Sequence, residues 1–343
     1  MSMNGCERTK AAIKHQKIDR FPVFPILLAP ACQMFGVNQR DFLSDSKVLA
    51  KTLLQARDYF DFDGIYVSRD NWVYHEALGG HLEYPDDDET FSKEVLLDSI
   101  KDFRKLSIPD PWTAPGMKTV LAAAKEIVEK TDNQYYIQAN IDSGPFSLGA
   151  ILRGTQNFLF DLYDEEKEAL DAFLNFCTDV VITYGKAMIE TGVHGIQMGE
   201  ANASLIDPNL FNEFVFPYLK RALDELQSDH CDRWVHICGN TKHLLPDLQN
   251  LPMEGFEVDA LVDLATAKNL IGNKIAVKGN LDTSELLFSS ADKVFNDTHS
   301  MLENYPLSTG LVVSAGCGVP RMTTPENLLA MVKANKKFSI HRK

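Results

Sequence analysis

The sequence is short of positive charge and of long apolar runs. Its 343 residues include 34 Lys and Arg against 48 Asp and Glu, a formal net charge of −14. Such an excess of acid disfavours binding to polyanions, so we expect no nucleic-acid partner. No stretch of about eighteen residues is both apolar and uncharged. Residues 1–17 mix Glu7, Arg8 and Lys10 with small side chains, unlike a secretory signal. We therefore expect a cytoplasmic protein with no membrane partner.

Cysteine is also scarce, and the glycine-rich phosphate-binding motifs are missing. Six cysteines in 343 residues are too few for a disulfide framework, which leaves packing, metal binding or catalysis as their roles. Neither G-x-G-x-x-G nor G-x-x-x-x-G-K-[ST] occurs in the chain. The absence of both motifs disfavours a doubly wound open sheet that binds nucleotides.

What the chain does contain is an alternation of short β-rich runs with longer amphipathic segments. With 45% hydrophobic residues it can bury a large core. Alternation of this kind predicts βα units around a parallel sheet. We predict an α/β fold, a single (βα)8 TIM-barrel domain over residues 1–343. The eight β-rich runs are residues 21–28, 64–68, 135–141, 195–198, 233–238, 256–259, 275–278 and 311–314.

The segments outside the strands complete this prediction. An N-terminal helical extension precedes the barrel, and a long insert, residues 71–115, follows the second strand. We expect the insert to form a hairpin and loop over one barrel end, with its acidic run at residues 86–89 as a solvated loop rather than a cation site. The predicted helices include residues 46–59, 117–130, 165–190, 208–227 and 291–303.

Two side chains at the end of the fifth run could bind a metal ion. His236 and Cys238 lie two positions apart, and such residues of a strand project from the same face. Cys317 follows the eighth run between Gly316 and Gly318, which allow a sharp turn. Functional groups of TIM barrels lie at the carboxyl ends of the strands, so these three can meet. One imidazole and two thiolates match a catalytic Zn²⁺ site. Packing in the core is the alternative interpretation.

Other polar side chains follow neighbouring runs. Glu200, after the fourth run, could be a catalytic proton acceptor, a labile fourth zinc ligand or a helix cap. Asp142, Asp259, Asn280 and Asp282 also stand at predicted strand ends. These four could bind substrate, and helix capping is at least as well supported for each of them.

Three motifs resemble a known family. They are residues 235–239 (VHICG), 278–282 (KGNLD) and 314–320 (SAGCGVP). By these motifs the chain is similar to the uroporphyrinogen decarboxylase superfamily, and within it resembles the methylcobamide:coenzyme M methyltransferases. The resemblance implies zinc bound by His236, Cys238 and Cys317. It also implies an acceptor thiol held as thiolate, whose sulfur attacks the methyl group of a methylated corrinoid, either methylcobalamin or a corrinoid protein.

The resemblance leaves the methyl acceptor open. The coenzyme M branch has an Asp-Pro dipeptide where this chain has Gly199-Glu200, so the thiol is coenzyme M, homocysteine or another small thiol. Transfer to tetrahydrofolate and a non-catalytic corrinoid-binding protein are the alternatives. Uroporphyrinogen decarboxylation is disfavoured, because residues 29–36 contain no cation where those enzymes bind a substrate with eight carboxylates.

Overall fold

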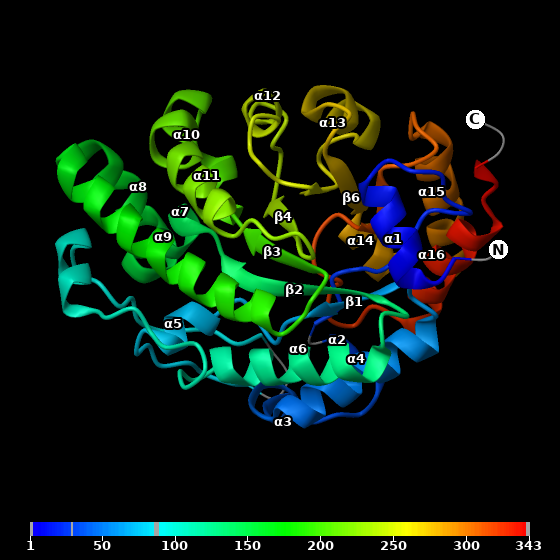
Figure 1. Cartoon of the computed structure of the whole chain (residues 1–343), viewed down its shortest axis with the longest axis horizontal. Helices are drawn as coiled ribbons and strands as arrows, with labels where there is room; N and C mark the ends of the chain where they lie inside the picture. Colours follow the sequence, from blue (N-terminus) through cyan, green and yellow to red (C-terminus); the bar gives the residue numbers. More distant parts are fainter. Residues whose placement is uncertain (1–2, 29, 86–88, 341–343) are drawn as a thin grey trace.

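A curved sheet of parallel strands forms the centre of the molecule (Figure 1). The computed structural model describes residues 3–28, 30–85 and 89–340. Within these residues seven strands pair in chain order, each with the next one along the sequence. The α/β, TIM-barrel-type fold is thereby confirmed. The strands are β1 (Gly64–Val67), β2 (Tyr136–Ser143), β3 (Gly195–Gly199), β4 (Asp232–Ile237), β5 (Gly255–Val258), β6 (Ala276–Leu281) and β7 (Leu311–Ala315).

The first of the eight predicted strands is the one that the structure does not contain. The segment that carries it still lies between β7 and β1, because Val23 forms a parallel bridge with Val313 and its carbonyl accepts a 2.9 Å bond from the amide of Asp63. Pro22 and Pro25 have no amide hydrogen, so a regular ladder cannot extend along this segment. The prediction of eight strands is wrong by this one element.

Helices surround the outside of the sheet (Figure 1). Those before β2 are α1 (Gly5–Ile13), α2 (Pro30–Met34), α3 (Gln39–Ser44), α4 (Ser46–Phe60), α5 (Val73–Ala77), η1 (Ile100–Lys105) and α6 (Met117–Thr131). Those between β2 and β4 are α7 (Pro145–Arg153), α8 (Thr155–Asp164), α9 (Lys167–Glu190), η2 (Ala201–Leu205), α10 (Pro208–Phe214) and α11 (Phe216–Glu225). The last are α12 (Leu245–Leu248), α13 (Leu264–Ile271), α14 (Thr283–Phe288), α15 (Ala291–Asn304) and α16 (Pro325–Lys337).

Two helical predictions need comment. The predicted helix at residues 208–227 is divided at Val215 into α10 and α11, because Pro217 has no amide hydrogen to continue the first helix. The insert contains α5, η1 and an antiparallel bridge between Glu83 and Phe91, which agrees with the expected hairpin. Within its acidic run, residues 86–88 lie outside the described residues.

The barrel interior contains polar side chains that bond to one another across it. Lys278 Nζ on β6 donates to Gln138 Oε1 on β2 at 2.7 Å and to Glu257 Oε1 on β5 at 2.9 Å. The hydroxyl of Tyr66 on β1 donates to Gln197 on β3 at 2.7 Å. Strands β2 and β6 are not neighbours in the sheet, so these side chains meet inside the barrel. The strands themselves are buried on both faces, as is usual for parallel sheets.

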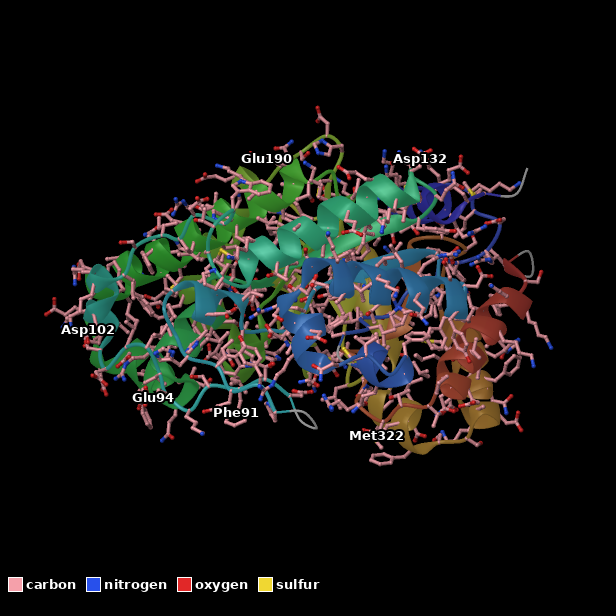
Figure 2. All side chains as sticks on the ribbon, turned by 90° about the horizontal axis from the view of Figure 1, so that it is seen from below. Phe91, Glu94, Asp102, Asp132, Glu190 and Met322 are labelled. Carbon is pink, nitrogen blue, oxygen red and sulfur yellow. The ribbon has the colours of Figure 1, made fainter. Side chains whose placement is uncertain are left out.

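The labelled residues of Figure 2 identify the two ends of the barrel. In Figure 2 Asp132 and Glu190, which precede β2 and β3, lie at one edge, while Phe91 and Met322 lie at the opposite edge. Met322 follows β7, so the second edge is the carboxyl-terminal face of the sheet.

Across the described part of the chain, no helix is long and apolar enough to cross a membrane.

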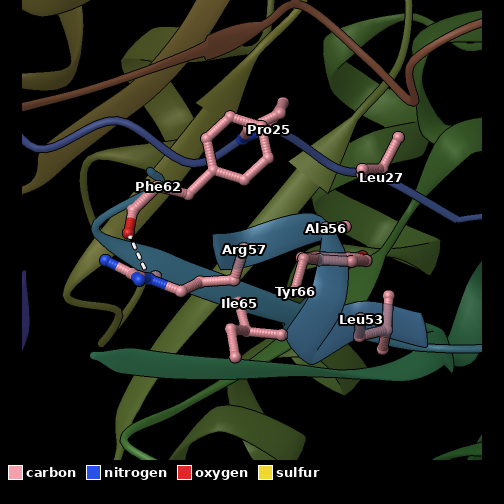
Figure 3. A pocket seen from close by; sticks show the side chains of 9 residues that line it. Pro25, Leu27, Leu53, Ala56, Arg57, Phe62, Ile65 and Tyr66 are labelled. Atoms are coloured by element: carbon pink, nitrogen blue, oxygen red, sulfur yellow. Dashed lines mark hydrogen bonds between the residues drawn. The ribbon is translucent and has the colours of Figure 1, made fainter. Parts of the chain in front are cut away.

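A small cavity lies beside the segment that replaces the first strand (Figure 3). Leu53, Ala56 and Arg57 of α4 line it together with Pro25 and Phe62, whose carbonyl accepts a 3.0 Å bond from Arg57. Its volume of 10 Å³ has room for one water molecule at most. It is therefore a packing defect and not a substrate site.

Candidate metal centre

His236, Cys238 and Cys317 form a compact group at the carboxyl-terminal face. Nε2 of His236 lies 3.0 Å from Sγ of Cys238, and the two sulfur atoms are 3.7 Å apart. All three ligand atoms lie within 4.8 Å of one another. Among residues 3–28, 30–85 and 89–340, they are the one group of three or more His, Cys, Asp or Glu side chains that could hold a metal ion.

Two strands bring this group together. His236 is the last but one residue of β4 and Cys238 directly follows that strand, while Cys317 follows β7. A Cβ atom on Gly316 would lie 2.4 Å from the amide nitrogen of Ala260, so only glycine allows the chain to pass there and present Cys317. Both cysteines are half-buried.

The ring of His236 is held by the neighbouring strand. Its Nδ1 donates to the carbonyl oxygen of Glu257 at 3.1 Å, which directs Nε2 toward the sulfur atoms. Burial lowers the pKa of His236, but the bond to Cys317 and the charge of that thiolate raise it to about 9 overall. Without a metal this shift favours the protonated form of the ring. A metal ion would displace that proton.

The two thiols differ strongly in acidity. The hydrogen bond from Cys238 lowers the pKa of Cys317, although burial opposes it, and His236 lowers it further. The same bond, together with burial, raises the pKa of Cys238. Cys317 is thus the more acidic of the two thiols.

The donor set fits zinc. Thiolate sulfur and imidazole nitrogen are the ligands that zinc prefers, and three protein ligands leave one position for a substrate. The group lies beyond the carboxyl ends of β4 and β7, the face at which TIM barrels bind their substrates.

Glu200 lies outside this group. Its side chain is fully buried, and its oxygen atoms accept bonds from the amides of Phe146 at 3.1 Å and Ser147 at 2.8 Å, at the start of α7. Burial raises its pKa to about 7, although the amides of Ser147 and Phe146 oppose the shift. Its own amide donates to the carbonyl of His236 at 2.7 Å. The sequence suggested a cap for the helix that follows Glu200, but that helix is capped by Asp207, and Glu200 instead caps α7, which lies earlier in the chain. Roles as a fourth ligand or proton acceptor stay predictions.

Asp142 and Asp259 both bind backbone amides. Oδ2 of the buried Asp142 accepts from the amide of Tyr74 at 3.0 Å, and burial raises the pKa of Asp142 to about 7. Asp259 accepts from the amides of Gly239 at 2.8 Å and Leu261 at 2.9 Å, which holds the loop that follows Cys238. Substrate binding by either carboxylate stays a prediction.

Asn280 lies near the end of β6, and Asp282 directly follows that strand. The amide group of Asn280 donates to the carbonyls of Asp259 at 3.1 Å and Val262 at 2.7 Å. The exposed Asp282 caps α14 through the amide of Ser284 at 2.7 Å. Both residues border a groove of 370 Å³ between α13 and α15. A role in substrate binding is untested for them too.

Sequence reasoning missed the buried pair Glu257 and Lys278. Each is a charged side chain in the middle of an apolar strand, with 2% and 1% of its surface exposed. A charge within a strand of a parallel sheet needs a partner, and that signal was available in the sequence. The sequence did not show which residue that partner is.

Comparison with known proteins agrees with this architecture. A family model described as uroporphyrinogen decarboxylase (URO-D) matches residues 5–338. The chain is 27% identical over 340 residues to the methylcobamide:CoM methyltransferase MtbA of Methanosarcina mazei, with 97% of each chain covered. It is 26% identical over 348 residues to a methylated-thiol–coenzyme M methyltransferase of the same organism, covering 99% of this chain and 91% of that protein. These names agree with the predicted enzyme class, a methyltransferase.

A solved structure, a methyltransferase from Methanosarcina mazei, superimposes with a TM-score of 0.89 at 23% identity, covering 98% of this chain and 99% of that one. At this identity the likeness shows the fold alone. The family model, in contrast, spans nearly the whole chain, including the positions of His236, Cys238 and Cys317. The chain therefore belongs to the uroporphyrinogen decarboxylase (URO-D) family.

Proposed function

We propose that the protein is a zinc-dependent methyltransferase that moves a methyl group from a methylated corrinoid to a small thiol. The observation that carries this proposal is the group of His236, Cys238 and Cys317, whose ligand atoms lie within 4.8 Å of one another at the carboxyl-terminal face of the barrel. The names of two relatives, which mention methylcobamide, methylated thiols and coenzyme M, support the same reaction class.

When bound, zinc would keep an acceptor thiol ionised at neutral pH, where a free alkyl thiol is mostly protonated. The side chains of the protein balance the charge of the ion and orient its histidine ligand. Cys238 and Cys317 provide two negative charges, and His236 is neutral once its Nε2 is a ligand and its Nδ1 donates to Glu257. Thiolate ligands therefore compensate the ion and leave an added sulfur electron-rich and nucleophilic.

Both the thiol and the methylated corrinoid are substrates in this reaction. The acceptor sulfur attacks the methyl carbon, so a sulfur–carbon bond forms while the carbon–cobalt bond breaks. The electron pair of the broken bond stays on cobalt, which changes from Co(III) to Co(I). The corrinoid arrives as methylcobalamin or on a small corrinoid protein.

Decarboxylation of a porphyrinogen, the activity that gives the family its name, fits these residues poorly. Helix α2 (Pro30–Met34), which follows the first barrel segment, has the sequence PACQM and contains no cation. A substrate with eight carboxylates needs cationic partners when it is desolvated. The whole chain also has a net charge of −14.

The test is to follow the absorbance of methylcobalamin with zinc-loaded protein and a panel of acceptors. Coenzyme M, homocysteine, a neutral thiol and tetrahydrofolate are supplied in turn, and chelator-treated protein is the control. We expect catalytic demethylation with at least one thiol, and a loss of that activity after chelation. Turnover with tetrahydrofolate alone, or stoichiometric demethylation without turnover, would refute the proposal.

A further inference from the structure

A buried ion pair lies directly beneath the proposed metal centre. Nζ of Lys278 is 2.9 Å from Oε1 of Glu257, and both side chains are almost completely buried. Desolvation of two charges costs about as much as their attraction returns, and apolar replacements are often as stable. A gain in stability therefore does not explain why a buried ion pair stands here, but its position next to the proposed metal centre can.

Glu257 and Lys278 lie level with His236 on the next two strands of the sheet. In the sheet register His236 stands beside Glu257, and Glu257 stands beside Lys278. Nδ1 of His236 donates to the backbone carbonyl of Glu257 at 3.1 Å. It also lies 4.0 Å from Oε2 of the same residue. Among the described residues, Oε2 has no hydrogen-bond partner of its own. Two oxygen atoms of one residue thus face the ring nitrogen that points away from the sulfur atoms.

Lys278 holds the other half of the carboxylate. Its ammonium group donates to Oε1 of Glu257 and to Gln138, and it lies 4.5 Å from the ring centre of Phe24 and 4.9 Å from that of Tyr66. These contacts surround the cation and prevent it from swinging away. As a result Oε1 is occupied, and only Oε2 is available to His236.

We propose that Glu257 and Lys278 are positioning residues of the metal centre. Glu257 keeps the proton of His236 on Nδ1 and makes Nε2 a better donor to the metal. Lys278 fixes the carboxylate in that orientation and keeps the summed charge of the pair at zero. This inference rests on the proposed function, because it assumes that His236, Cys238 and Cys317 bind zinc.

The experiment measures zinc affinity directly by competition with a chromophoric chelator, so that it does not depend on turnover. Glu257→Gln keeps the backbone carbonyl and removes the carboxylate charge, but it leaves Lys278 as an unpaired buried cation. The double variant Glu257→Gln/Lys278→Met avoids that unpaired charge. Loss of an outer partner of a ligating histidine weakens metal binding by about 10-fold to 100-fold. Because the carbonyl bond to Nδ1 remains and only the carboxylate 4.0 Å away is lost, we expect an increase of about 10-fold in the zinc dissociation constant of the double variant.

The matched control is Lys268→Met. Lys268 is equally buried, but its Nζ donates to the carbonyl of Ile275, before β6 begins and thus at the opposite end of the barrel. Its replacement should leave the zinc dissociation constant unchanged. Each variant is also loaded with Co(II), whose visible absorption reports the geometry around the ion. We expect a changed spectrum in the double variant and a wild-type spectrum in the control.

The outcomes separate this inference from the proposed function. A folded double variant with wild-type zinc affinity and a wild-type Co(II) spectrum would overturn the positioning role. Wild-type protein that binds no zinc would overturn the metal centre and this inference with it. Wild-type protein that binds zinc but transfers no methyl group would refute the methyltransferase proposal, while the affinity comparison would still decide the roles of Glu257 and Lys278.

Discussion

Replacing Cys317 by alanine should remove most of the stabilisation that zinc gives to the protein. Cys317 supplies one of three ligand atoms, and its sulfur lies 3.7 Å from that of Cys238. Binding of structural zinc by four ligands is worth about 10–16 kcal/mol, which is about 2.5–4 kcal/mol per ligand. Loss of one ligand should therefore weaken zinc binding by about 100-fold to 1,000-fold.

This loss can be measured as a shift in melting temperature. Free zinc at 100 times its dissociation constant stabilises the wild-type fold by about 2.7 kcal/mol. The unfolding entropy of 343 residues is about 0.7 kcal/mol per degree, so the wild-type melting temperature should rise by about 4 °C. At the same zinc concentration Cys317→Ala should gain less than about 1 °C.

Cys177→Ala is the control, because Cys177 is fully buried in α9 and takes no part in the metal-binding group. This variant should melt at a lower temperature than wild type, since it loses packed sulfur, yet keep the zinc-dependent rise of about 4 °C. A rise of wild-type size in Cys317→Ala would refute the assignment of that residue as a ligand.

Three further perturbations test residues around the centre. The pKa of Glu200 is raised to about 7 from an ordinary 4.5, so the folded state binds its proton more tightly than the unfolded state does. The free energy of unfolding should therefore fall by about 3 kcal/mol as the pH rises from about 4.5 to about 7. Urea titrations at several pH values should show a flatter profile for Glu200→Gln, and an unchanged profile would contradict the shift. Asn280→Ala leaves the carbonyls of Asp259 and Val262 without their donor and should cost about 2 kcal/mol by denaturant unfolding; a loss below about 0.5 kcal/mol would show that these bonds contribute little. In Gly144→Ala the new Cβ would lie 2.3 Å from Oε1 of Glu200, so we expect a loss of about 2 kcal/mol, and an unchanged urea midpoint would mean that the carboxylate can move away freely.

Helix boundaries were predictable wherever the signal was local. The predicted helix at residues 46–59 corresponds to α4, and Asp207 followed by Pro208 marks the start of α10. In both cases an aspartate just before the helix accepts bonds from the first amides of the turn. Such capping involves residues two or three positions apart, so the sequence alone contains all of its parts.

Features that depend on partners far along the chain were less accessible. The first predicted strand has apolar residues like the others, but its two prolines leave it attached by isolated bonds between β7 and β1. The direction of Glu200 was undetermined, because its partners at the start of α7 lie more than fifty positions earlier in the chain. The pairing of Glu257 with Lys278 depended on the order of strands in the sheet.

The metal-binding group shows both contributions. The alternation of side chains along a strand is a local property, so the sequence by itself determined that His236 and Cys238 project from one side of β4. It also determined that glycines flank Cys317. Only the tertiary structure decided that Cys317 lies beside Cys238, because β4 and β7 are three places apart in the sheet and their ends meet through its curvature. A distance of 3.7 Å between two sulfur atoms 79 positions apart follows from the closure of the barrel and not from any local preference.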